Sequence, residues 1–133
     1  MVKLFFLLLF IFPSLTFSQS LIQGDLVLTP IVDGTEPYQF IQDFKIQYID
    51  SGRCTDESFV ELITEGGHVS LKPIKFSVSC KIVSWGRIEN EKDRYILLNY
   101  PLILVRVQNP QSENIFYYKI EDTDKIRSIL KKY

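Results

Sequence analysis

Residues 38–48 read YQFIQDFKIQY, and this alternation of apolar and polar side chains predicts a β-strand. The apolar members of one parity are expected to face a core: Tyr38, Phe40, Phe44, Ile46 and Tyr48. The polar side chains between them would then face water. Gln42 interrupts the apolar parity, which predicts a β-bulge at that position.

The same period recurs along the rest of the chain. Residues 74–82 read IKFSVSCKI, which predicts a strand that points Cys80 inward. Further strands are expected at 26–32, 95–98, 102–107 and 115–120. Polar segments at 89–93 and 108–114 are interpreted as hairpin loops.

Two segments have helical features. Near the C-terminus, Ile126, Ile129 and Leu130 would share one helix face after a cap at Asp122 or Thr123. Residues 55–65 favour a short helix, with a strand over 59–64 as the alternative. The predicted fold class is therefore α+β, mostly antiparallel β-sheet with a C-terminal helix. The alternative is an all-β sandwich or a small barrel.

The N-terminus has the layout of a secretory signal peptide. A basic start at Lys3 precedes an apolar run from Leu4 to Phe12, and Thr16-Phe17-Ser18 offers small residues around a cleavage site. The run is shorter than the roughly 20 residues of a membrane-spanning helix. We therefore expect a signal peptide at 1–18 and a single β-rich globular domain at 19–133. The protein would be secreted or periplasmic, with no stable membrane insertion after cleavage.

The two cysteines of the chain are Cys54 and Cys80. In an oxidising compartment such a lone pair is expected to form a disulfide bond. Closing a loop of this length would stabilise the domain by roughly 3 to 4 kcal/mol in the chain-entropy model.

Charge and composition argue against several kinds of partner. The chain has 15 basic and 16 acidic residues, and loss of Lys3 with the signal peptide leaves 14 against 16. This near-neutral balance gives no bulk attraction to nucleic acid. His68 is the only histidine, so we expect no zinc site and no other metal site. No motif implies a cofactor.

The candidate binding residues are Trp85 and Arg87, which flank Gly86. A tryptophan beside a glycine can present a flat ring to a sugar or peptide, and Arg87 could hold an acidic group. The alternative is a core tryptophan at the end of a strand, near the disulfide.

Two classes of function remain open. Because the sequence carries no recognisable catalytic motif, no catalytic residue is assigned. We expect a non-catalytic binding or inhibitor-type module for a protein or glycan of the cell envelope. The alternative is a small secreted hydrolase that uses carboxylates or His68, expected in an exposed turn. The sequence leaves the oligomeric state open.

The first prediction concerns processing and oxidation. We expect the natively exported protein to have the mass of residues 19–133 with Cys54 and Cys80 joined, and to take up no alkylating reagent. Intact mass spectrometry with and without reduction measures both properties. Two alkylatable thiols, or a chain that still begins at Met1, would contradict the prediction.

Overall fold

The computed structural model describes residues 19–50, 58–74 and 83–133. The predicted signal peptide at 1–18, both cysteines and most of the strand predicted at 74–82 lie outside these residues. Export and the disulfide between Cys54 and Cys80 therefore stay predictions.

The described chain forms two antiparallel sheets. The five-stranded sheet has the spatial order β1 (Leu21–Gln23), β2 (Leu26–Asp33), β3 (Phe40–Gln47), β7 (Val83–Arg87) and β6 (Lys72–Ile74). The four-stranded sheet has the order β5 (Gly67–Ser70), β4 (Phe59–Thr64), β8 (Leu102–Gln108) and β9 (Ile115–Lys119). Neither sheet closes into a barrel. The predicted α+β class, mostly antiparallel with a helix near the C-terminus, is confirmed.

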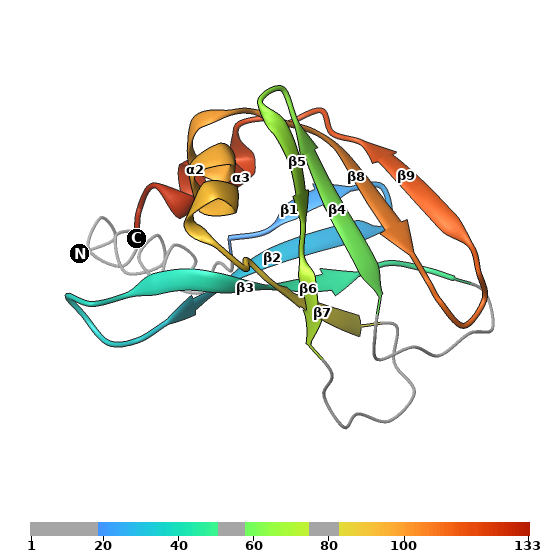
Figure 1. Cartoon of the computed structure of the whole chain (residues 1–133), viewed down its shortest axis with the longest axis horizontal. Helices are drawn as coiled ribbons and strands as arrows, with labels where there is room; N and C mark the ends of the chain where they lie inside the picture. The colour runs from blue at the N-terminus through green and yellow to red at the C-terminus, as the bar shows by residue number, and fades with distance from the viewer. Residues whose placement is uncertain (1–18, 51–57, 75–82) are drawn as a thin grey trace, which may run out of the picture.

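One hydrophobic core lies between the two sheets. Figure 1 shows β4 and β5 of one sheet running across β2 and β3 of the other. Fully buried side chains from both sheets meet there: Leu28, Phe44, Ile46, Leu62, Val105 and Val107. Removing these apolar surfaces from water provides the main driving force for the packing.

Two short helices cover one end of the sheets (Figure 1). They are α2 (Glu91–Asn99) and α3 (Lys125–Leu130). Ile96 of α2 and Ile126 and Ile129 of α3 are buried in the core. Within the described residues, no helix is both long and apolar enough to span a membrane.

The predicted bulge is present in β3. Ile31 of β2 pairs with Asp43, but the next residue, Val32, pairs with Ile41, so Gln42 is the extra residue. A bulge reverses which parity faces the core. Ile41 is accordingly buried, whereas Phe40 is 43% exposed.

The same reversal corrects part of the predicted core. Phe44, Ile46 and Tyr48 are buried as expected, but the prediction for Tyr38 and Phe40 was wrong. Tyr38 is 81% exposed in the connection between β2 and β3. Figure 1 shows this hairpin reaching beyond the four-stranded sheet, so its tip has no opposing layer to pack against.

The helix preferred for residues 55–65 was wrong over its described part. Residues 59–64 form β4, with Val60, Leu62 and Thr64 buried and the residues between them less so. β4 is hydrogen-bonded to β5 on one side and β8 on the other. Pairing on both edges outweighs the weak helical preference of a short segment.

The hairpin loop predicted at 89–93 and the strand predicted at 95–98 were also wrong, because the chain forms α2 there. The Asn90 side chain accepts a hydrogen bond from the backbone N–H of Asp93 at 2.9 Å and caps the helix. Glu91 and Asp93 lie in the first turn, where acidic groups suit the helix dipole. Burial of Ile96 and Leu97 then fixes the helix against the core.

The C-terminal part of the chain follows the predictions more closely. The loop at 108–114 joins the paired strands β8 and β9, and α3 ends the domain. The predicted cap at Asp122 or Thr123 was wrong. The residue that precedes α3 is Asp124, whose side chain contacts Arg127 and makes no capping hydrogen bond.

The chain passes from one sheet to the other at Leu71. β5 pairs with β4 up to Ser70, and β6 begins at Lys72 and pairs with β7 in the other sheet. The Leu71 N–H still donates to the Val60 carbonyl at 3.0 Å, and its buried side chain packs over Gly86. Strands that switch sheets in this way form the corners of crossed sandwiches.

Gly86 is expected to be necessary for this corner. A Cβ atom at Gly86 would lie 2.8 Å from the Leu71 Cβ, closer than packed carbon atoms come. We expect Gly86→Ala to lower the free energy of unfolding by about 1 to 3 kcal/mol, because the core must shift to admit the methyl group. Urea unfolding measures the change.

The matched control for this variant is Lys72→Ala, which alters an exposed residue on the neighbouring strand β6. It should change the stability by less than about 0.5 kcal/mol. Equal stability of the Gly86→Ala and wild-type proteins would show that the corner is not tightly packed.

Candidate functional site

Trp85 lies on the outer face of the five-stranded sheet. Its neighbours along β7, Ser84 and Gly86, are buried and face the core, so Trp85 and Arg87 point the other way. Trp85 is half-buried and is not among the side chains that form the core. The structure therefore places this ring on a sheet surface and not between the sheets.

A lysine side chain lies over the Trp85 ring. Lys45 is the cross-strand partner of Trp85, and its Nζ atom lies 5.9 Å from the ring centroid. At this distance a cation is attracted to the electron-rich face of an indole. A ligand that reaches this surface would meet an aromatic ring and a positive charge in the same small area.

Arg87 already has an acidic partner in the protein. Its Nε donates to Asp43 Oδ1 at 2.7 Å, and its Nη2 donates to Asp43 Oδ2 at 3.2 Å. These hydrogen bonds raise the pKa of the Arg87 guanidinium, which stays charged. An acidic ligand would have to compete with Asp43 for the same two N–H groups.

His68 lies on the outer face of the other sheet. It belongs to β5 and not to the turn that was predicted, although its side chain is 61% exposed. Its Nδ1 atom lies 3.2 Å from Glu61 Oε1 on the neighbouring strand. Ser70 follows two residues later on the same strand face, but no hydrogen bond joins it to His68 in the described structure.

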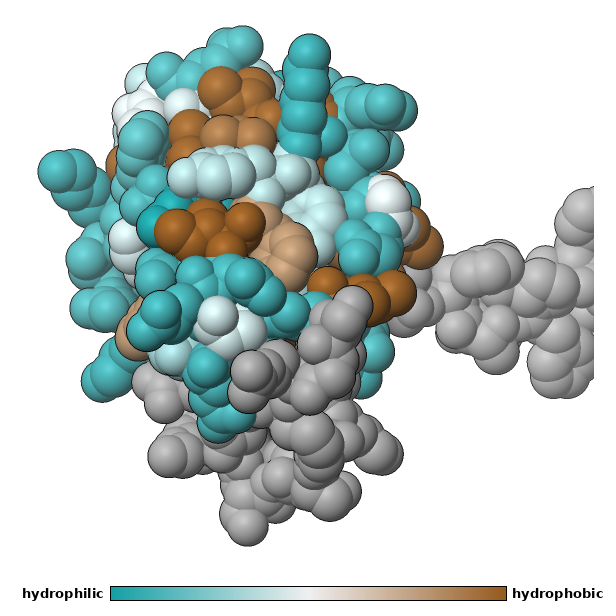
Figure 2. All heavy atoms as spheres, turned by 90° about the vertical axis from the view of Figure 1, so that its right-hand side faces the viewer, coloured by the Kyte–Doolittle hydropathy of each residue, from teal (hydrophilic) through white to brown (hydrophobic). Residues whose placement is uncertain are grey.

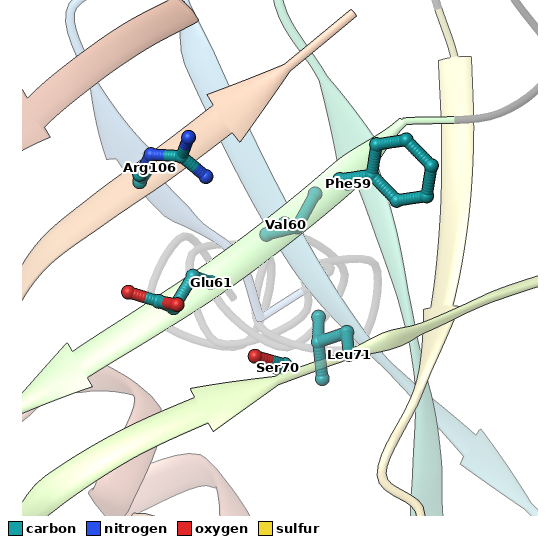
Figure 3. Close-up of a pocket in the computed structure, with 6 residues that line it drawn as sticks. All are labelled: Phe59, Val60, Glu61, Ser70, Leu71 and Arg106. Carbon is teal, nitrogen blue, oxygen red and sulfur yellow. The ribbon is translucent and has the colours of Figure 1, made fainter. Parts of the chain in front are cut away.

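A small hollow lies over β4 on the outer face of the four-stranded sheet, with β5 on one side and β8 on the other. Its volume is about 150 Å³, and its lining residues are Phe59, Val60, Glu61, Ser70, Leu71 and Arg106. β5 leaves β4 at Leu71, so Phe59 and Val60 at the start of β4 have no paired residue in β5. Figure 3 shows Arg106 and Glu61 toward one end of the hollow and the Phe59 ring toward the other.

Exposed apolar side chains lie at and beside this hollow on the outer face of the four-stranded sheet. Phe59 is 46% exposed, and Ile115 and Tyr117 of β9 are also exposed. Register places Tyr117 beside Arg106, which in turn lies beside Glu61. Figure 2, which views the molecule from the right-hand side of Figure 1, shows apolar atoms gathered among hydrophilic ones.

Sequence reasoning did not find the hollow. The helix preferred for residues 55–65 would place Phe59 and Glu61 on different helix faces, away from Ser70. Arg106 was expected within the strand at 102–107, and nothing in the sequence marked it as a candidate binding residue. Its position next to Glu61 depends on the register between β4 and β8, for which the sequence holds no local signal.

A buried carboxylate near the end of β3 has a structural role. Asp50 is almost fully buried and accepts hydrogen bonds from Asn109 at 2.9 Å, from the Ser112 hydroxyl at 2.5 Å and from Asn114 at 3.0 Å. These bonds attach the β8–β9 loop to the segment that follows β3. They satisfy the carboxylate within the protein, as buried charges require.

Two tyrosines, Tyr48 (buried) and Tyr118 (half-buried), lie close to this region. The Tyr48 hydroxyl is 2.6 Å from the Ser58 hydroxyl, to which Ser84 donates at 2.7 Å. Burial raises the pKa of Tyr48, and burial together with Asp25 raises the pKa of Tyr118. Both groups therefore stay neutral at physiological pH and are poor candidates for a catalytic base.

In residues 19–50, 58–74 and 83–133, no three histidine, cysteine, aspartate or glutamate side chains converge on a point where a metal ion could bind. Comparison of the whole chain with family models, with curated proteins and with solved structures gives no match.

Proposed function

We propose that this chain is exported and acts as a non-catalytic binding or inhibitor-type module for a protein or glycan of the cell envelope. The observation that carries the proposal is the position of Trp85. An indole ring buries a large apolar area when it packs, and here it stands half-buried on an outer sheet face beside Lys45. Tryptophan is among the residues most enriched at binding hot spots.

Arg87 lies on the same surface, where it forms an ion pair with Asp43. The two hydrogen bonds of this pair fix both side chains on neighbouring strands, two register positions away from Lys45 and Trp85 and on the same sheet face. The surface therefore offers an aromatic ring, two cations and one carboxylate on a rigid sheet. Rigid presentation lowers the entropy lost when a partner binds.

Replacement of Trp85 tests this surface. We expect Trp85→Ala to weaken binding to the partner by about 2 kcal/mol or more, which is roughly thirtyfold in Kd. The probes are purified peptidoglycan and solubilised envelope proteins, and the measurement is depletion of the protein from solution at increasing probe concentration.

The matched control is Tyr95→Ala, which removes an exposed aromatic ring from α2, away from this sheet face. It should bind as the wild type does. Unchanged affinity of a folded Trp85→Ala variant would remove Trp85 from the contact surface.

A hydrolase is the second candidate, because the structure supplies His68 with a carboxylate neighbour in Glu61. A carboxylate that orients a histidine is one part of a hydrolytic site. On the binding-module proposal, the exported protein should release no product from peptide or glycan substrates, and His68→Ala should bind the partner as the wild type does. Hydrolysis that His68→Ala abolishes would overturn the binding module in favour of an enzyme.

A further inference from the structure

The hollow over β4 combines one apolar side with one polar side. Phe59 and Leu71 contribute the apolar side, and the Phe59 ring is 46% exposed. Glu61, Ser70 and Arg106 contribute the polar side. They supply, in that order, a hydrogen-bond acceptor, a hydroxyl that both donates and accepts, and a fork of donors.

The charges in the hollow balance. Glu61 brings one negative charge and has His68 Nδ1 at 3.2 Å. Arg106 brings one positive charge, and its Nη2 donates a long hydrogen bond of 3.4 Å to the Gln108 side chain. Because neither sign dominates, the hollow has no net attraction for an anion or a cation. Donors and acceptors placed together instead suit hydroxyl groups, which can serve as both.

The size of the hollow limits the ligand to a small group. Its volume of about 150 Å³ lies below the roughly 300–1,000 Å³ of pockets that enclose drug-sized ligands. One six-membered ring with its hydroxyl groups is of suitable size, and an open rim would let neighbouring rings of a longer chain continue over the sheet. Tyr117, beside Arg106, offers a second exposed ring in that direction.

We propose that this hollow binds one ring of a neutral sugar. The apolar C–H face of the sugar would pack on Phe59, and its hydroxyl groups would bond to Arg106, Glu61 and Ser70. Packing of an amphipathic ligand on an aromatic ring removes apolar surface from water while its polar edge stays hydrogen-bonded. This site lies on the outer face of the four-stranded sheet, whereas Trp85 lies on the five-stranded sheet.

The test uses the full exported protein and defined probes. Neutral tetrasaccharides of glucose, mannose, galactose and N-acetylglucosamine are titrated into the protein and followed by calorimetry and by nuclear magnetic resonance. We expect at least one of them to bind saturably with a Kd of about 1 mM or tighter. Phe59→Ala should weaken that binding about tenfold or more, and Phe59→Tyr, which keeps a ring, should restore it.

A second variant keeps the test informative if Phe59→Ala is unstable. Arg106→Lys keeps the charge but loses the planar fork, and should weaken binding of the same sugar without a large change in folding. Ile115→Ala is the control, because it removes an exposed apolar side chain of the same sheet that does not line the hollow.

Several results would overturn the proposal. They are no saturable binding of any of the four sugars at about 10 mM, binding that Phe59→Ala and Arg106→Lys leave unchanged, and binding of an unstructured peptide in place of a sugar. A tetramer of galacturonic acid that binds more tightly than the galactose tetramer would show an anion site instead.

Failure here can be separated from failure of the proposed function. The sugar titration depends on Phe59 and Arg106 of the four-stranded sheet, whereas the envelope-binding test depends on Trp85 of the five-stranded sheet. A Trp85→Ala variant should bind the tetrasaccharide as the wild type does.

Discussion

The bend at Leu71 is the constraint on which the rest of this structure depends. There the chain leaves the edge of the four-stranded sheet and joins the edge of the five-stranded sheet, with Leu71 packed over Gly86. Because the two edges are consecutive in sequence, the sheets are joined at one corner and must cross. Crossing brings their inner faces together around Phe44 and Leu62, and leaves each outer face free to differ from the other.

The two outer faces differ in chemistry. On the five-stranded sheet, the ion pair of Asp43 and Arg87 lies near Lys45 and Trp85. This outer face therefore presents three charged side chains and one large aromatic ring. On the four-stranded sheet, exposed apolar side chains lie beside a hollow whose lining has one carboxylate, Glu61, and one guanidinium, Arg106. The hollow lies where β5 stops pairing with β4, and Phe59 precedes the first paired residue of β4.

Much of the fold could be predicted from local pattern. Alternation between 38 and 48 identified β3, and the one residue that broke it, Gln42, marked the bulge. The loop at 108–114 and the helix at 125–130 were found from polar clusters and from helical spacing. The errors lay where two patterns compete. Residues 59–64 can be helix or strand, and residues 95–98 have strand-like composition but follow the Asn90 cap.

The candidate sites were less accessible to sequence reasoning. Trp85 and Arg87 could be chosen by residue type, but alternation alone did not decide whether the ring faced the core. The sequence by itself determined the β-rich character, the bulge and the identity of these side chains, because such properties depend on neighbours two to four residues away. Only the tertiary structure decided that Trp85 faces outward and that Arg87 forms an ion pair with Asp43. It also decided that Phe59 and Arg106 line the same hollow. Those relations depend on register between strands far apart in the chain, where a shift of one residue would turn each side chain to the opposite face.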